Sequence, residues 1–296
     1  MITGANALEL IGNTPLVRIN RLNPYKKVNI YAKIEGFNPS GSIKDRIALN
    51  MIEQAEHNGE LTKDKTIIEA TSGNTGIGIA MVAAIKGYKV KIVMSENVSI
   101  ARRKILKAYG AEVILTPAEE NTDGAIRKAE QIVKDNPGKY FMPNQFKNKY
   151  NVLAHYETTA KEIFNQMPDV DVFVASIGTS GTLMGISSFV KKWRDIEVVA
   201  AEPTLGHKIQ GLKNMKEAIV PEIYNKNKID TCVTVEDEDA FETTRRLAKE
   251  EGLFIGMSSG AALWAALQKA KKMKSGNIVV IFPDRGDRYL STDLFS

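Results

Sequence analysis

The 296-residue sequence contains one cysteine, Cys232, and three histidines. One cysteine cannot form an intramolecular disulfide, and scarce cysteine is typical of a reducing compartment. We therefore expect a cytoplasmic protein. His57, His155 and His207 are far apart in the sequence and far from Cys232, so the spacing of a metal site is missing. We expect surface or packing roles for these histidines and no bound metal.

Long apolar runs are also missing. No stretch approaches the roughly 18 apolar residues that a membrane-spanning helix needs, and no basic segment followed by an apolar block opens the sequence. The formal net charge of +5 is spread along the chain without long basic runs, which gives no indication of nucleic-acid binding. Apolar residues make up 43% and charged residues 25%, as in water-soluble globular proteins. We therefore expect neither a membrane nor a nucleic acid as partner.

The glycine motifs of nucleotide-binding enzymes are absent as well. Gly73, Gly76 and Gly78 form G-x-x-G-x-G, the reverse of the dinucleotide fingerprint, and no G-x-x-x-x-G-K-[ST] occurs. A kinase or a dehydrogenase is therefore a poor fit.

From Lys65 onward, short β-rich runs alternate with helical patterns, which predicts parallel sheets covered by helices on both faces. We predict two lobes, 1–146 and 147–296, with an early hairpin at about 13–35 that joins the second lobe. The segment 203–230 is longer than an ordinary connection, so it is either a functional loop or contains further structure. The predicted strands are 65–70, 89–94, 112–115, 170–175, 197–202, 231–235 and 277–283.

The stretch NPSGSIKDR, at 38–46, combines a turn with the start of a helix. Ser42 and Asp45 fit a capping box, which makes Lys44 the second residue of a helix that ends near Gly59. A cation there opposes the helix dipole. Helical periodicity also places Lys44 near the middle of an apolar arc formed by Ile43, Ile47, Ala48, Met51, Ile52 and Ala55. A desolvated lysine at a helix N-terminus has a lowered pKa, as an amine nucleophile or general base requires; the alternative is a snorkelling side chain.

Three turns rich in glycine, serine and threonine precede predicted helices: TSGNTG (71–76), SIGTSGTLMG (176–185) and MSSGAA (257–262). We expect each to leave the carboxyl end of a strand, where parallel sheets bind ligands. Backbone N–H groups at a helix N-terminus form an anion site. Any one turn is explained equally well by tight packing of glycine. Together with an inward lysine, however, an anion loop and neighbouring hydroxyl and amide groups suit a lysine-bound pyridoxal phosphate.

Six stretches resemble those of cysteine synthases (O-acetylserine sulfhydrylases) of the pyridoxal-phosphate fold type II superfamily, over nearly the whole chain. They are IGNTPLVRI, KIEGFNPSGSIKDR, TSGNTGIGIA, GTSGTLMG, SSGAA and PDRGDRYLST. The resemblance implies an α/β fold like that of the tryptophan synthase β subunit. Such a fold has two open, mostly parallel, twisted sheets with helices on both faces, and pyridoxal 5'-phosphate in the cleft between the lobes.

The resemblance also implies roles for individual residues. Lys44 is expected to form the Schiff base with the cofactor and to move the Cα proton as general base. Asn74 is expected to contact the ring hydroxyl and Ser258 the pyridine nitrogen. The phosphate is expected to bind Gly178, Thr179, Ser180, Gly181 and Thr182. The substrate carboxylate is expected to bind Thr71, Ser72, Thr75 and Gln145.

The implied reaction is a β-replacement that makes L-cysteine from an O-activated L-serine and sulfide through an α-aminoacrylate. One alternative is a cystathionine β-synthase-like condensation with homocysteine. Another is a serine or threonine dehydratase, whose lysine usually lies in S-F-K-x-R-G-A rather than SGSIKDR. A non-enzymatic role as a binding partner of serine acetyltransferase is weakened because every catalytic position is filled.

The branch of the family leaves both substrates open. Two stretches, PDRGDRYLST and LKNM (212–215), are more similar to the cysteine synthase B branch. One stretch, GHKIQG (206–211), is more similar to the main branch. The best-known members of the main branch carry glycine in place of Ser180. Members of the B-like branch include enzymes that accept O-phosphoserine, or that take sulfur from thiosulfate or a protein thiocarboxylate. We expect Lys208 and Lys213 to be solvated loop lysines, with contact to an anionic substrate as the alternative. The resemblance implies a homodimer, with serine acetyltransferase or a sulfur-carrier protein as possible partners.

Overall fold

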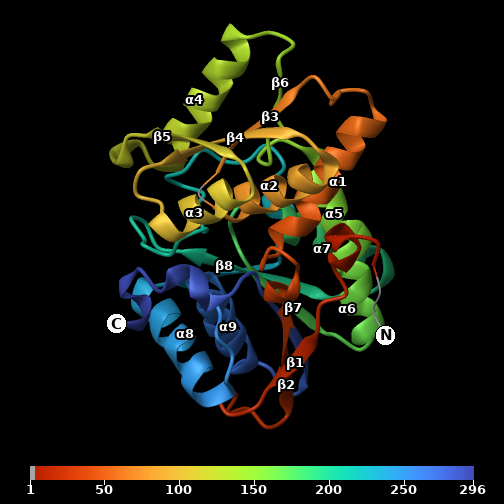
Figure 1. Ribbon diagram of the computed structural model, residues 1–296. Helices are drawn as coiled ribbons and strands as arrows, with labels where there is room; N and C mark the ends of the chain where they lie inside the picture. Colours follow the sequence, from red (N-terminus) through yellow and green to blue (C-terminus); the bar gives the residue numbers. More distant parts are fainter. Residues whose placement is uncertain (1–3, 72) are drawn as a thin grey trace. The chain divides into compact units, whose positions relative to one another are not determined.

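The computed structural model describes residues 4–71 and 73–296. These residues form two units, each with its own sheet (Figure 1). Unit 1 contains residues up to Ile11 together with Asn38–Asn151. Unit 2 contains Gly12–Phe37 and Val152–Ser296.

The sheet of unit 1 has parallel strands in the order β5, β4, β3, β6. Ile67 of β3 packs into the apolar cluster of α1 and α2, whereas Ile68 and Ala70 pack against α4 on the other face. Both faces of β3 are buried, which explains its nearly continuous apolar sequence. The elements are α1 (Lys44–His57), β3 (Thr66–Ala70), α2 (Asn74–Lys86), β4 (Lys89–Ser95), α3 (Ile100–Ala108), β5 (Glu112–Thr116), α4 (Asn121–Asp135) and β6 (Tyr140–Phe141).

The sheet of unit 2 runs in the order β1, β2, β10, β7, β8, β9. The hairpin strands β1 and β2 are antiparallel, and the remaining neighbours are parallel. The strands are β1 (Leu16–Ile19), β2 (Val28–Ile34), β7 (Val172–Ser176), β8 (Glu197–Pro203), β9 (Thr231–Val235) and β10 (Gly276–Phe282). Helix α5 (Lys149–Ala154) begins in unit 1 and continues through a π-helical turn (His155–Thr159) into α6 (Ala160–Gln166). The other helices of unit 2 are α7 (Gly181–Trp193), α8 (Asp237–Glu251) and α9 (Met257–Ala270).

The predicted alternation of strands and helices is confirmed, and so is the fold class. The segment 203–230 is an irregular loop with one short 3-10 turn, Lys226–Lys228, among its described residues. The loop is nevertheless packed, because Ile209 and Leu212 are buried and the Asn214 side-chain amide donates to the Pro203 carbonyl over 2.7 Å.

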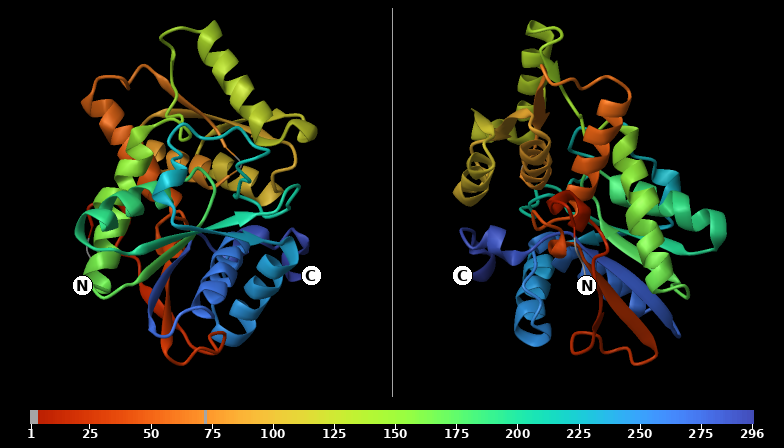
Figure 2. Two further views of the ribbon diagram at one scale, coloured as in Figure 1. Left: turned by 180° about the vertical axis from the view of Figure 1, so that it is seen from behind. Right: turned by 45° about the vertical axis from the view of Figure 1, so that its right-hand side comes forward.

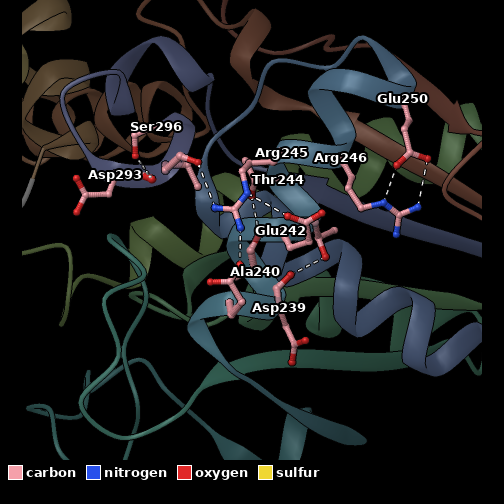
Figure 3. Close-up of polar contacts among 12 residues, drawn as sticks. Asp239, Ala240, Glu242, Thr244, Arg245, Arg246, Glu250, Asp293 and Ser296 are labelled. Atoms are coloured by element: carbon pink, nitrogen blue, oxygen red, sulfur yellow. Dashed lines mark hydrogen bonds and ion pairs between the residues drawn. The ribbon is translucent and has the colours of Figure 1, made fainter.

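Helices α8 and α9 lie side by side against the six-stranded sheet (Figure 2). Their close approach requires Gly260, because a Cβ atom there would lie 2.1 Å from the Thr244 hydroxyl and 2.2 Å from the Ala240 carbonyl oxygen. The outer side of α8 carries ion pairs, in which Arg246 Nε lies 2.6 Å from Glu250 and Arg245 Nε 3.1 Å from Glu242 (Figure 3). None of the described helices combines the length and apolar character needed to cross a membrane.

Candidate active site

Lys44 is the first residue of α1 and is half-buried. The apolar arc predicted around it is confirmed, since all six of its members are buried. The predicted capping box is wrong. The Ser42 hydroxyl does accept a hydrogen bond from the Lys44 N–H over 3.2 Å, but the Asp45 carboxylate accepts from the Ser40 N–H over 2.7 Å instead of reaching back to Ser42. The buried Asp45, next to Lys44 in the sequence, therefore stabilises the preceding turn at Ser40 rather than the helix cap.

The turn after β3 lies beside Lys44 because α2 packs closely on α1. A Cβ atom at Gly78 of α2 would lie 3.1 Å from the Lys44 carbonyl oxygen and 3.2 Å from Ala48 Cβ, so only glycine permits this approach without movement. Asn74 opens α2 and is half-buried, and Thr71 is buried with its hydroxyl accepting from the Gly73 N–H over 3.2 Å. Unit 1 thus places Lys44 near the TSGNTG turn. Ser72, also predicted here, lies outside the described residues.

Gln145 joins this group through buried hydrogen bonds. Its side-chain oxygen accepts from the Thr75 hydroxyl over 2.6 Å, and its Nε2 donates to the Ala70 carbonyl over 3.4 Å. A glutamine amide has two N–H donors, so the second remains for a ligand such as a carboxylate. The structure therefore brings Thr71, Thr75 and Gln145 to the end of β3.

Glu69, which was not among the predicted site residues, contacts the backbone at Gln145. It is fully buried in β3, and its carboxylate accepts from the N–H groups of Asn144 over 2.7 Å and Gln145 over 3.2 Å. Burial raises the pKa of Glu69 to about 7, although the two N–H groups favour the ionised form. One acidic residue in a mostly apolar strand, two positions before TSGNTG, was the signal available in the sequence.

In unit 2, the turn 178–182 follows β7 and leads into α7, as predicted. Ser180 has a left-handed φ of +69°, is 3% exposed, and has a hydroxyl with no hydrogen-bond partner among the described residues. Gly178 has no room for a side chain, because a Cβ atom would lie 2.6 Å from the Gly211 carbonyl oxygen. The buried Thr179 and the helix start at Gly181 complete the turn. A buried hydroxyl and the N–H groups of a helix N-terminus form a suitable cradle for a phosphate.

Thr182 of this turn contacts His155, a second residue that was not among the predicted site residues. His155 is fully buried in the π-helical turn, where its Nε2 lies 3.3 Å from the Thr182 hydroxyl and its Nδ1 3.0 Å from the Thr159 hydroxyl. The packing role expected for His155 is therefore combined with a contact to the turn 178–182. π-Helical turns occur frequently at functional sites, but they leave no recognisable pattern in a single sequence.

The third turn differs from the prediction because it does not leave a strand. It follows α8 and an extended segment that makes one isolated bridge, between Ile255 and Arg285. Ser258 is the second residue of α9 and is buried. The letters of Gly256–Gly260 match G-x-S-x-G, yet a hydrolase nucleophile requires a sharp strand-to-helix turn, which is absent here. The glycine of SSG serves the packing of α8 on α9.

The two loop lysines have different surroundings. Lys208 is exposed, and its backbone N–H donates to the Asp237 carboxylate over 2.9 Å. Lys213 is half-buried, and its backbone N–H donates to the Ile177 carbonyl over 2.8 Å, next to the turn 178–182. Lys213 is thus the better placed of the two for an anionic group bound near that turn.

Each unit, taken by itself, carries groups of the kind that pyridoxal phosphate binds. Unit 1 supplies an amine at Lys44 and an amide at Asn74, and unit 2 supplies a buried partnerless hydroxyl at a helix N-terminus. The residues therefore fit the cofactor. Across the described chain, no cluster of three or more His, Cys, Asp or Glu is arranged to hold a metal ion.

The fold and these turns define an α/β enzyme built to hold a phosphorylated cofactor. Residues 7–284 match the family described as pyridoxal-phosphate dependent enzyme. The chain belongs to this family.

Similar proteins and structures cover almost the full chain. A probable cysteine synthase from Bacillus subtilis (strain 168) is 47% identical over 305 residues, which cover 99% of this chain and 98% of that protein. The crystal structure of a cysteine synthase from Entamoeba histolytica has a TM-score of 0.94 at 40% identity, with 99% of this chain and 91% of that chain covered. An O-ureido-L-serine synthase structure has a TM-score of 0.94 at 39% identity, with 99% and 96% covered.

Proposed function

We propose that this protein is a cysteine synthase that makes L-cysteine from O-acetyl-L-serine and sulfide. The observation that carries this proposal is the 47% identity to a probable cysteine synthase over nearly the full length of both chains. Within the chain, the buried and partnerless hydroxyl of Ser180 supports the binding of a phosphorylated cofactor.

We assign the following roles to residues of the site. Lys44 attaches the cofactor covalently, Asn74 donates to its ring hydroxyl, and Ser258 faces its pyridine nitrogen. The turn from Gly178 through Thr179, Ser180 and Gly181 to Thr182 binds the phosphate. Thr71, Thr75 and Gln145, together with Ser72 from outside the described residues, bind the carboxylate of the amino-acid substrate.

Bound pyridoxal phosphate withdraws electrons from the amino-acid Cα, which allows a leaving group to depart from Cβ and a nucleophile to replace it. The chain's own residues orient the substrate and move the proton. Lys44 stands at the N-terminus of α1, where the helix dipole disfavours its ammonium form. The Lys44 amine can therefore accept the Cα proton and return it after sulfide has added. Ser258 offers a hydroxyl rather than a carboxylate, so it does not force a proton onto the ring nitrogen.

A spectroscopic titration with product analysis tests this function. The purified holoenzyme should be yellow, its visible band should change on addition of O-acetylserine, and sulfide should restore the band with formation of cysteine. Separate titrations with O-phosphoserine, and with thiosulfate, a protein thiocarboxylate and homocysteine as nucleophiles, distinguish the alternatives. Cystathionine as the main product, or release of a keto acid from serine or threonine, would replace the proposed function with one of the related activities.

We also propose that the chain acts as a homodimer in a reducing, cytoplasmic environment. Light scattering coupled to size-exclusion chromatography gives the mass of the assembly. Pull-down with serine acetyltransferase and with a sulfur-carrier protein tests the two candidate partners. The single cysteine, Cys232, is consistent with such an environment.

A further inference from the structure

Glu69 is a fully buried carboxylate with an unusual set of contacts. The donors to its two oxygens are the backbone N–H groups of Asn144 and Gln145, and no lysine or arginine forms an ion pair with it among the described residues. Burying a carboxylate without a cation opposes folding. A side chain of this kind suggests a role beyond packing, because an apolar residue would suit the buried strand better.

The Glu69 carboxylate accepts hydrogen bonds at the point where strand β6 stops pairing with strand β3. Strand β6 pairs with β3 only at Thr66–Tyr140 and Ile67–Phe141, and continuation of this register would place residue 143 beside Glu69. The chain turns away at that point, and Asn144 adopts a left-handed φ of +51°. The side chain of Glu69 thus supplies the acceptors for N–H groups that have no strand partner.

Gln145 is held at each of its polar groups by this arrangement. Its N–H donates to Glu69, its carbonyl accepts from the Asn151 side-chain amide over 2.7 Å, and its side-chain oxygen accepts from Thr75. Side chains, rather than a helix or sheet, therefore define the position of Gln145. Loss of the Glu69 contacts would release the turn and let the Gln145 amide rotate.

We propose that Glu69 is a positioning residue, whose carboxylate fixes the backbone of residues 144–145 and so holds the Gln145 amide in the orientation that binds the carboxylate of the amino-acid substrate. The part of this statement that concerns the substrate rests on the proposed function. The part that concerns the turn does not, and it can be measured without substrate.

The test compares Glu69→Gln with Ile67→Val in the holoenzyme at pH 8. The glutamine has the shape of the native side chain, but its NH2 group faces one of the two N–H donors, so that N–H loses its acceptor. The Ile67→Val control lies on the same strand and the same face, is equally buried, and leaves the 144–145 turn intact. Glu69→Asp, which retains the charge but withdraws the oxygens by one methylene, is a second variant in case Glu69→Gln does not fold.

Two measurements decide the proposal. Hydrogen exchange of the Asn144 and Gln145 amides should be at least about tenfold faster in Glu69→Gln, and unchanged in Ile67→Val. The O-acetylserine concentration that produces half of the visible spectral change should rise about tenfold in Glu69→Gln alone, with the resting cofactor band and kcat little altered.

The outcomes separate this proposal from the proposed function. Unchanged amide exchange in Glu69→Gln and Glu69→Asp, or unchanged half-saturation despite faster exchange, would overturn the role assigned to Glu69. Absence of any response of the wild-type holoenzyme to O-acetylserine would instead reject the proposed function. The exchange rates would still decide whether Glu69 fixes the turn.

Discussion

The hydroxyl of Thr75 donates a hydrogen bond of 2.6 Å to the side-chain oxygen of Gln145, and both side chains are buried. This contact connects the first turn of α2 with the turn after β6. It also orients the Gln145 amide, because the side-chain oxygen is occupied by Thr75 and an Nε2–H group is left to bind a substrate.

Replacing Thr75 tests the function of that contact. Thr75→Val keeps the shape of the side chain but removes the hydroxyl, so we expect weaker binding of O-acetylserine by about tenfold or more, which corresponds to the roughly 1–3 kcal/mol of a lost buried hydrogen bond. Thr75→Ser should restore most of the affinity. Spectral titration of each holoenzyme measures the effect. Equal half-saturation in wild type and Thr75→Val would argue against a role of this contact in substrate binding.

Lys44→Ala should abolish covalent attachment of the cofactor. After reduction with borohydride, intact-mass measurement should find the added cofactor mass on the wild-type chain and none on Lys44→Ala. The matched control is Lys107→Ala, an exposed lysine of α3, which should retain the adduct and full activity. An adduct that persists in Lys44→Ala would require a different attachment residue.

Ser180 combines a left-handed backbone with a buried, partnerless hydroxyl. Ser180→Gly should raise the free energy of unfolding of the cofactor-free protein by about 1 kcal/mol, because glycine adopts this conformation without steric cost. Both Ser180→Gly and Ser180→Ala should bind pyridoxal phosphate more weakly, since each lacks the hydroxyl. Denaturant titration and cofactor-binding isotherms measure the two effects. Unaltered cofactor affinity in both variants would show that the hydroxyl does not contact the phosphate.

The raised pKa of Glu69 predicts a pH-dependent stability. The folded chain holds a proton on Glu69 up to about pH 7, whereas the unfolded chain releases it near the ordinary pKa of 4.5. The folded state thus binds more protons between these values, so Glu69 lowers the free energy of unfolding as the pH rises, by about 3 kcal/mol in total. Relative to wild type, Glu69→Gln should gain this amount between pH 4.5 and 8. A constant difference in chemical denaturation across that range would contradict the shifted pKa.

Gly260→Ala should destabilise unit 2, because the added methyl group would overlap the Thr244 hydroxyl and the Ala240 carbonyl of α8. Overpacking of this kind costs about 1–3 kcal/mol. Ser259→Ala is the control from the same helix turn. Its buried hydroxyl has no partner among the described residues, so its loss should leave the unfolding free energy nearly unchanged. Equal stability of the two variants would show that α8 and α9 can separate at little cost.

Much of the fold could be predicted because hydrophobic periodicity is local. The apolar arc of α1 and the β-rich runs identified their elements with small errors at the ends, as for the predicted strand 89–94, which spans Lys89–Ser95. Strand β6 was missed because a two-residue strand has no period. The turn before α9 was expected to leave a strand because its glycine and serine pattern is similar to that of the other two turns. Whether a strand precedes such a turn depends on pairing with residues far away in the sequence.

The candidate site was less accessible to prediction than the fold. Glycine and hydroxyl turns are visible as patterns, and Lys44 broke two local rules. Glu69 and His155 depend instead on contacts with residues 76 and 27 positions away, respectively. The direction of the Asp45 side chain was predicted incorrectly because Ser40 competes with the helix cap for the same carboxylate.

The place of β10 between β2 and β7 has a consequence for synthesis of the protein. Strand β2 ends at Ile34 and β7 at Ser176, but the strand that joins them begins only at Gly276. During synthesis, about 240 residues must therefore be added after β2 before its parallel neighbour β10 is available for pairing. During that interval the edge of β2 is open to incorrect pairing, so we expect slow maturation of unit 2 and a need for chaperone protection until translation is nearly complete.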